Sequence, residues 1–401
     1  SPMNSLPANS PRWFTEIILE KGGILSFYDF MNIALNNPNN GYYGSGKAKI
    51  GQNGDFVTSP SMSDDFSLLL AIQLEEWILQ IKNNLNSNRK ITVIEFGSGN
   101  GCLLSGIINY FLNNNAQIIN DISFRIIELN VGMLEIQKKS LNKFIEQGID
   151  IKWVSLNDLE DHSLDGIVIA HEVLDAFCVE RIQFKKGVIY QQGVELNNEN
   201  QTLNFINLPL TEKIKKFLEE IKNELGVNIP PQDATEDWTT ELNIDNLSWL
   251  ENLSRKVNNG ILLIIDYAID SKKYYSSQKS DGTILAYKNQ RAFREILNNP
   301  GAYDLTCHIC SDILIYQAEL VGFESLGLVK QGEALLLLGL AQKLFDIQKN
   351  LKNDLSQALL KREAMLRLVD PMCLGDFKWF VFKKSSKKEF LIKSRCINKS
   401  I

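Results

Sequence analysis

Acidic side chains follow three short apolar runs of the chain. Glu95 lies in "ITVIEFG" and Glu128 in "SFRIIEL", while a third run, "GIVIAH", ends at His171 and is followed by Glu172 and Asp175. Short runs that are apolar on both faces are typical of buried strands in a parallel sheet. The carboxyl ends of such strands meet at one edge of the sheet, where α/β proteins bind ligands. We therefore predict that these five side chains surround one site.

A glycine-rich turn follows the first of these runs, with Gly97, Gly99 and Gly101 in a G-x-G-x-G pattern. The dinucleotide pattern G-x-G-x-x-G needs a glycine where this chain has Cys102. A P-loop needs G-K-[ST], which the turn lacks. Both phosphate-binding interpretations are weakened, and a dinucleotide oxidoreductase remains the weaker alternative.

The turn and the strand-end acids suit S-adenosylmethionine, which carries no phosphate. Glycines let the backbone approach the amino-acid end of that ligand, with Ser98 in the same turn. Glu95 either positions the turn or contacts the ligand ammonium group through water. Glu128, followed by Leu129, can accept both ribose hydroxyls, because an ionised carboxylate only accepts hydrogen bonds. The sequence therefore predicts a methyl-donor site.

An acceptor for the adenine amino group is expected after the third strand, where "WVSLNDLED" supplies Asn157 and Asp158. Each acid taken alone has a structural alternative, since a strand-end glutamate is often only solvated and an aspartate often caps a helix. The combination in one sheet favours the ligand.

The pair Glu172 and Asp175, with His171 before them, would lie near the transferred methyl group. Two carboxylates suit a cationic acceptor such as arginine, because its guanidinium is always charged and offers five donors. They could orient it and accept the proton that it releases. The alternative is that both acids only brace the segment that follows.

Composition limits the classes of function. The chain has 401 residues, 42 lysines and arginines against 48 acids, and a formal net charge of −6, which argues against binding nucleic acid through phosphate contacts. No apolar run is long enough to span a membrane. Six scattered cysteines and the lack of a signal peptide favour the cytoplasm. No metal is expected, since "CHIC" has no second ligand pair.

Alternating strands and helices predict an α/β fold, a seven-stranded and mostly parallel sheet with helices on both faces. The other strands are expected at "IKWVS", "GILLIIDY", "FESLGLV" and "EALLLLGL". The expected organisation is an N-terminal helical region with a glycine-rich lid (1–85), a ligand-binding sheet domain (86–180 and 260–340), an inserted substrate-facing α+β subdomain (181–259), and a C-terminal helix with a tail (341–401).

Several motifs together resemble the MidA-like family of class I S-adenosylmethionine-dependent methyltransferases. They include "NPNNGYYG", "IGQNGDFVTSP", "EFGSGNGCLL", "IVIAHEVLDAF", "DGTILAY" and "DPMCLGDFKWF", in the order of the family. The resemblance implies a Rossmann-like methyltransferase fold, S-adenosylmethionine as cofactor, and a protein substrate with arginine as the favoured acceptor. The mitochondrial member assembles respiratory complex I and methylates one of its core subunits, which implies a complex I-like partner.

The resemblance also places Thr58, Ser59 and Pro60 over the cofactor. It departs at Ser61, where the family has glutamate, and at His171, where the family has asparagine. Cofactor positions match better than acceptor positions. Two alternatives follow, a cofactor-binding assembly factor with little catalysis and a small-molecule methyltransferase, and the sequence leaves a homodimer open.

Overall fold

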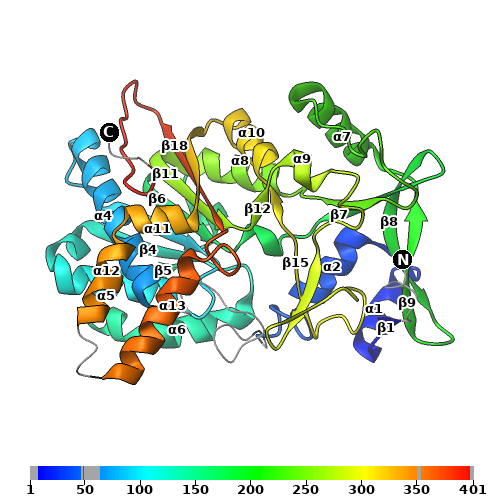
Figure 1. Ribbon diagram of the computed structural model, residues 1–401, viewed down its shortest axis with the longest axis horizontal. Coiled ribbons are helices and arrows are strands. Elements are labelled where there is room, and N and C mark those ends of the chain that lie inside the picture. Colours follow the sequence, from blue (N-terminus) through cyan, green and yellow to red (C-terminus); the bar gives the residue numbers. More distant parts are fainter. Residues whose placement is uncertain (1–7, 47, 49–63, 350–353, 398–401) are drawn as a thin grey trace.

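The computed structural model describes residues 8–46, 48, 64–349 and 354–397. Within these residues the chain forms a seven-stranded sheet and a six-stranded sheet, which occupy opposite ends of the molecule (Figure 1). Two smaller sheets lie in the same chain, β12–β16 and β14–β13–β15.

The seven-stranded sheet is mostly parallel, as the sequence predicts. β11, β6, β3, β4 and β5 run parallel, and β18 is antiparallel to its neighbours β11 and β17. In spatial order the strands are β17 (Glu324–Lys330), β18 (Lys378–Ser385), β11 (Val257–Asp266), β6 (Leu164–His171), β3 (Ile91–Phe96), β4 (Ile122–Ile127) and β5 (Ile151–Trp153). The α/β fold class is thus confirmed.

Helices cover both faces of this sheet, because its central strands are apolar on both sides. Val93 of β3 packs in one core cluster and Ile94 in another. The helices of the first cluster are α4 (Asp64–Leu85), α5 (Cys102–Asn114), α6 (Val131–Glu146), α11 (Gln331–Leu337) and α13 (Leu355–Val369). Those of the second are α8 (Asn246–Lys256) and α10 (Ser311–Leu320).

The six-stranded sheet is built mainly by the insertion. The hairpin expected after "DGIVIAH" is present as β7 (Glu180–Lys185) and β8 (Val188–Asn197), followed by β9 (Thr202–Leu208), and β10 (Thr239–Leu242) pairs with β7. Between β9 and β10 in the chain, α7 (Glu212–Leu225) is the helix that the sequence predicts. The N-terminal strands β1 (Ala8–Asn9) and β2 (Ile24–Ser26) join this sheet through β9 and β8.

The structure divides the chain differently from the expected organisation. The expected N-terminal region is split, since β1 and β2 pair with the insertion whereas α4 packs on the seven-stranded sheet. The last helix of the insertion, α8, also packs on that sheet through Leu250 and Leu253. The insertion therefore returns to the larger sheet.

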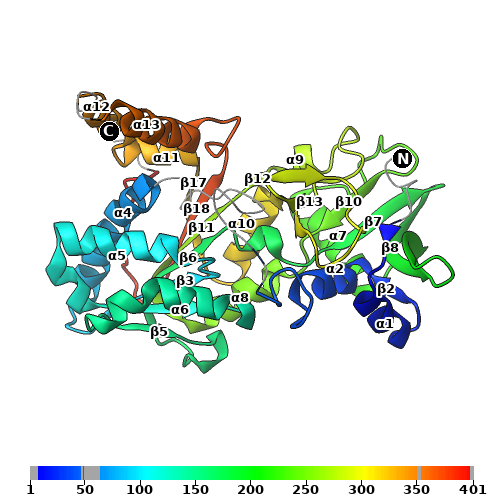
Figure 2. The same cartoon turned by 90° about the horizontal axis from the view of Figure 1, so that it is seen from below.

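Two expectations for the C-terminal part were wrong. "EALLLLGL" forms helix α11 instead of a strand, and the segment expected as a tail supplies β18. β18 fits between two strands because Trp379 and Phe382 are fully buried, and Trp379 Nε1 donates to Gln331 Oε1 at 3.1 Å. Where one helix was expected over 341–368, the described residues form α12 (Leu340–Lys349) and α13. Both lie above the sheet in Figure 2.

The remaining elements are the helices α1 (Arg12–Glu20), α2 (Phe27–Asn36) and α9 (Ser271–Tyr274), the 3-10 helices η2 (Ala116–Asp121), η3 (Leu156–Asp158) and η4 (Leu174–Ala176), and the strands β12 (Ala268–Ile269), β13 (Leu285–Lys288), β14 (Arg291–Phe293), β15 (Asp304–Thr306) and β16 (Ile309–Cys310). Among them, α2 and η4 contribute residues to the cavity described below.

Candidate active site

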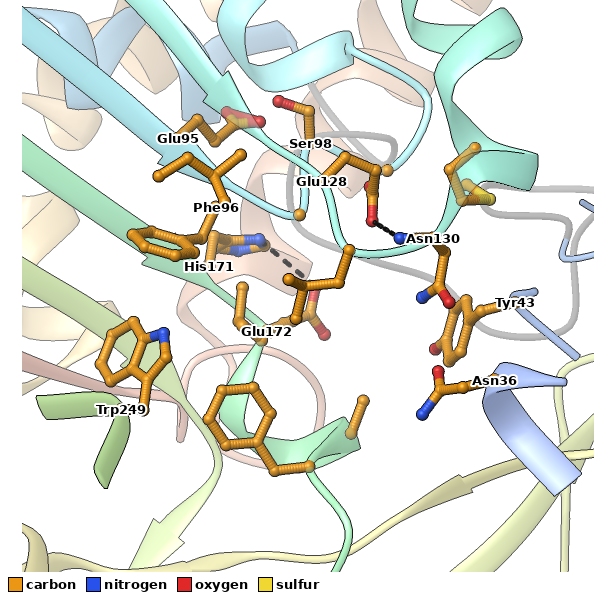
Figure 3. Close-up of a pocket in the computed structure, with 18 of the residues that line it drawn as sticks. Asn36, Tyr43, Glu95, Phe96, Ser98, Glu128, Asn130, His171, Glu172 and Trp249 are labelled. Carbon is orange, nitrogen blue, oxygen red and sulfur yellow. Dashed lines mark hydrogen bonds and ion pairs between the residues drawn. The ribbon is translucent and has the colours of Figure 1, made fainter. Parts of the chain in front are cut away.

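A cavity of about 700 Å³ lies at the carboxyl ends of β3, β4 and β6. The glycine turn, the segment after β4 and the segment after β6 form one side of it, and residues from α2 and α8 form the other (Figure 3). Of the residues predicted from sequence, the cavity lining contains Glu95, Gly97, Ser98, Gly99, Glu128, Leu129, His171 and Glu172. The sheet edge thus brings most of the predicted site together.

The glycine turn presents its backbone to the cavity. Gly97, Gly99 and Gly101 have φ values of 58°, 56° and 84°, which other residues rarely adopt. Gly97 N donates to Ile127 O at 2.9 Å, which fixes the turn to the next strand. Gly101 has a structural role, because it is the N-cap residue of α5 and does not line the cavity.

Glu95 is buried below the turn, and burial raises its pKa to about 7. A side-chain hydrogen bond with Ser98 partly opposes this increase. Both side chains line the cavity and can also contact a polar ligand there.

Glu128 is held at the cavity wall by a residue that sequence reasoning missed. Gln137 of α6 donates to Glu128 Oε1 at 2.7 Å and to Gly99 O at 3.1 Å, so it links the acid to the glycine turn. Gln137 is fully buried, and Trp153 Nε1 donates to its Oε1 at 3.0 Å. Asn130 N donates to the other Glu128 oxygen at 3.1 Å. A buried glutamine on an otherwise amphipathic helix was the signal that could have identified it.

Helix α8 supplies a wall that was not predicted. Trp249 packs edge-on against Phe96 and Phe177, with ring centroids 5.3 and 5.9 Å apart, and its Nε1 is buried without a described partner. By contrast, Asn157 and Asp158 are exposed on η3 and do not line the cavity. The expectation that these two residues meet the adenine has no support in the geometry, because α8 closes the cavity on that side.

A cluster of four buried carboxylates adjoins the cavity, formed by Glu172, Asp175, Asp266 and Asp304, and we call it the carboxylate cluster. Each of these side chains is at most 8% exposed. Burial raises the pKa of Glu172, Asp175 and Asp266 well above the usual range, and neighbouring carboxylates raise it further. Among the described residues, no lysine or arginine forms an ion pair with these three acids.

Glu172 is the member that faces the cavity (Figure 3). Its φ of 55° is in the left-handed region, which is uncommon for a residue with a side chain, and its N–H donates to Ile265 O at 2.8 Å. Its Oε2 atom has no described hydrogen-bond partner and lies 3.5 Å from His171 Nδ1. The backbone thus holds a carboxylate oxygen in place for a donor.

Asp266 and Asp304 complete the cluster from other parts of the chain. Asp266, at the end of β11, accepts the N–H groups of Leu174 and Asp175 at 3.1 and 3.2 Å. Asp304, at the start of β15, accepts the Tyr43 hydroxyl at 2.7 Å. Asp266 could have been found by the rule that identified Glu128, since the apolar run "LLII" is also followed by an acid. Asp304 had no comparable signal.

His171 is a neutral group of the cavity wall. Burial lowers its pKa to about 3, and its ring lies 5.3 Å from the ring of Phe66. Its Nε2 atom is buried without a described partner. A neutral imidazole can donate one hydrogen bond and accept another, but one with so low a pKa is a poor base at neutral pH.

Three other expectations concern the lid segment, a metal site and a membrane span. Thr58, Ser59 and Pro60 lie outside the described residues, as does half of the lid expected over 41–54. No group of three or more His, Cys, Asp or Glu side chains in the described ranges could hold a metal ion. None of the helices in these ranges is long and apolar enough to cross a membrane.

Comparison with known proteins identifies the family. A family of S-adenosyl-L-methionine-dependent methyltransferases matches residues 69–329, which is more than half of the chain. The chain belongs to this family. The matched residues include the glycine turn, Glu128 and all four acids of the carboxylate cluster.

The methyltransferase also resembles curated proteins and solved structures. It is 26% identical to the mitochondrial protein arginine methyltransferase NDUFAF7 of Bos taurus, over 89% of this chain and 79% of that protein, and 25% identical to that of Homo sapiens, over 90% and 80%. A COG1565 superfamily member from Burkholderia thailandensis, solved with S-adenosyl-homocysteine bound, is 24% identical with a TM-score of 0.78. That alignment covers 96% of this chain and 92% of the other, and it shows the shared fold.

S-adenosylmethionine is the cofactor of the methyltransferase, and the cavity fits it. The backbone of the glycine turn and the polar side chains of Glu95 and Ser98 suit its amino-acid end. Glu128 suits the ribose hydroxyls, and the unpaired Trp249 Nε1 and its ring suit the adenine. These assignments of single residues to parts of the cofactor are our predictions.

The affinity for S-adenosylhomocysteine should depend on pH through Glu95. The ligand ammonium group stabilises the ionised carboxylate, so binding below the Glu95 pKa of about 7 must release a proton. We expect binding about tenfold weaker at pH 6 than at pH 8. Burial also raises the pKa of neighbouring Glu128, so Glu128→Gln is the control for its contribution. Titration calorimetry of Glu95→Gln should show weak binding at both pH values, and a pH-independent wild type would contradict the role.

Proposed function

We propose that this methyltransferase transfers a methyl group to an arginine side chain of a protein. The observation that supports this most directly is the carboxylate cluster beside the cofactor cavity, where Glu172, Asp175 and Asp266 form no ion pair with a lysine or arginine of the described residues. Burying carboxylates without a counter-charge is costly. A guanidinium is a cation that neither solvent nor burial deprotonates, so it would satisfy the cluster.

The chemistry of each residue follows from its position. The cofactor supplies an activated methyl group. Glu172 faces the cavity and would hold two N–H groups of the acceptor, localising its positive charge away from the attacking nitrogen. A raised pKa makes the ionised Glu172 carboxylate a stronger base for the proton that the nitrogen releases once it carries the methyl group. The charge of Asp175 contributes to raising the pKa of Glu172.

The curated relatives support the same class of acceptor, since their names give protein arginine methyltransferase. The resemblance to the MidA-like family extends the proposal to a subunit of a complex I-like NADH dehydrogenase as acceptor, methylated in the cytoplasm. The competing function is a cofactor-binding assembly factor with little catalysis. It is favoured by His171, which replaces the asparagine of the family with a neutral, weakly basic group.

Methyl-labelled S-adenosylmethionine separates these possibilities. The protein is incubated with an extract of cells that lack it, labelled bands are resolved on a gel, and their hydrolysate is analysed for methylarginine. Gly99→Val is the control, because valine is strongly disfavoured at the Gly99 φ of 56° and should prevent cofactor binding. We expect a band that contains methylarginine and is absent with Gly99→Val. Cofactor binding without any labelled protein would contradict the proposal.

A further inference from the structure

The cavity that holds the predicted cofactor residues also contains a row of polar side chains on α2. The row is formed by Tyr28, Asn32 and Asn36, and we call it the α2 row. Its members are spaced four residues apart, so they lie on one face of the helix, and all three line the same cavity as Glu172. Figure 3 shows Asn36 across the cavity from Trp249, with Glu172 between them. The α2 row and the proposed catalytic acid therefore face one continuous space.

The cavity is open to solvent at α2 and α8. Of the described polar side chains that line it, the exposed ones are Asn32 on α2 and Ser248 and Asn252 on α8. Glu172 is buried by contrast, with 8% of its side chain exposed. A ligand that reaches from solvent to Glu172 thus enters the cavity next to the α2 row.

Hydrogen bonds hold both ends of α2 in place. The Tyr28 hydroxyl donates to Asp245 Oδ2 at 2.5 Å, which joins the first turn of α2 to α8. After the last turn, Tyr43 N donates to Leu35 O at 2.8 Å, and the Tyr43 hydroxyl donates to Asp304 at 2.7 Å. Because Asp304 belongs to the carboxylate cluster, α2 is fixed relative to the acids that the proposed acceptor would meet.

The two asparagines of the α2 row have hydrogen-bonding groups to spare. Asn36 Nδ2 donates to Asn32 Oδ1 at 2.9 Å, and Cys178 Sγ lies 4.0 Å from the same oxygen. Neither the Asn32 side-chain nitrogen nor the Asn36 side-chain oxygen has a hydrogen-bond partner among the described residues. A side-chain amide offers a donor and an acceptor, which are the groups that complement a peptide bond.

The charge of the cavity favours a basic ligand. Its described lining includes the carboxylates of Glu95, Glu128, Glu172 and Asp245, and no lysine or arginine belongs to that lining. The first two acids are predicted to face the cofactor, whereas Glu172 and Asp245 remain for another ligand. A segment of positive charge is therefore attracted to the cavity, and an acidic one is repelled.

We propose that the α2 row binds the main chain of the acceptor protein beside its arginine, while the guanidinium reaches Glu172 in the buried part of the same cavity. The inference rests on the proposed function. From Tyr28 to Asn36 the row measures about 12 Å along the helix, which is the length of about four residues of an extended chain. The enzyme would thus select an arginine in an extended segment over a guanidinium without peptide groups.

Two probes that share a guanidinium but differ in peptide groups test the α2 row without turnover. They are N-acetyl-arginine methylamide and propylguanidine, and their binding to the full chain is followed by ligand NMR with saturating S-adenosylhomocysteine. We expect the wild type to bind the arginine probe at least about tenfold more tightly, because its peptide groups add hydrogen bonds. The double variant Asn32→Leu with Asn36→Leu should lose this preference and bind propylguanidine like the wild type.

Asn142→Leu is the matched control. Asn142 is also an exposed asparagine on a helix, where it donates to Glu146 four residues later at 2.9 Å, but it does not line the cavity. It should keep the preference of the wild type. Affinity for S-adenosylhomocysteine should be unchanged in every variant. If the double variant kept its circular dichroism spectrum but lost this affinity, the α2 row would belong to the cofactor site and the proposal would be overturned.

The remaining outcomes separate the α2 row from the proposed function. A double variant that still preferred the arginine probe would show that its peptide groups bind elsewhere. A wild type without any preference for this probe would likewise overturn the role of the row. In both cases the labelling experiment decides separately on the proposed function, which fails only if no protein gains methylarginine.

Discussion

Glu172→Gln should lower methyl transfer about 100-fold or more while the protein still binds S-adenosylhomocysteine. The change keeps the size of the side chain but removes the charge that would orient the guanidinium and the oxygen that would accept its proton. The effect should be large because Glu172 is buried and its Oε2 atom lacks a described hydrogen-bond partner. Single-turnover transfer of labelled methyl groups, with the cofactor pre-bound, measures the chemical step directly.

Glu180→Gln is the matched control for this variant. Glu180 is also buried, at 4% exposure, and burial raises its pKa to about 7, but it accepts the Tyr28 N–H in the six-stranded sheet. We expect this control to retain nearly all activity. If both variants transferred methyl groups at the wild-type rate, Glu172 would have no catalytic role and the assembly-factor function would gain support.

Asp266→Leu should lower the free energy of unfolding by about 3–6 kcal/mol, since leucine leaves three buried N–H groups without an acceptor. These are the N–H groups of Leu174, Asp175 and Tyr267, which Asp266 accepts at 3.1–3.2 Å. Activity should fall with stability, because η4 carries Asp175. Urea unfolding without ligand measures the change.

Two further variants test whether the lost hydrogen bonds cause this loss of stability. Asp266→Asn keeps one carbonyl oxygen and should cost about 1–2 kcal/mol. Asp161→Ala removes an exposed acid that pairs with Lys256 at 2.8 Å, and its change should stay within about 1 kcal/mol. If Asp266→Leu unfolded at the same urea concentration as the wild type, η4 would not depend on this carboxylate.

The central strands could be predicted because local composition alone determines them. β3, β6 and β11 are apolar on both faces and contain several β-branched isoleucine and valine residues, which favours a buried parallel strand. The leucine-rich "EALLLLGL" carries no such information, since an unbroken apolar run fits a strand or a helix equally. β18 could not be recognised, because its flanking lysines resemble a solvated tail and its burial depends on two strands distant in sequence.

The same contrast applies to the site. Glu95, Glu128 and Glu172 follow predicted strands, so the sheet alone places them at one edge. Asp304 begins β15 and Tyr43 lies in the turn after α2, and their 2.7 Å hydrogen bond spans 261 positions of the chain. Trp249 was hidden for a related reason, because nothing in the insertion shows that its last helix returns to the larger sheet. Contacts between segments far apart in sequence are therefore what local patterns do not reveal.

The position of β18 has a consequence for the synthesis of the protein. β11 ends at Asp266 and β17 at Lys330, yet their common neighbour begins only at Lys378. While the ribosome makes the intervening residues, both strands have an unpaired edge, and open apolar edges are sites of aggregation. The sheet can thus close only after β18 has been made, and a chaperone that shields these edges would favour its correct completion.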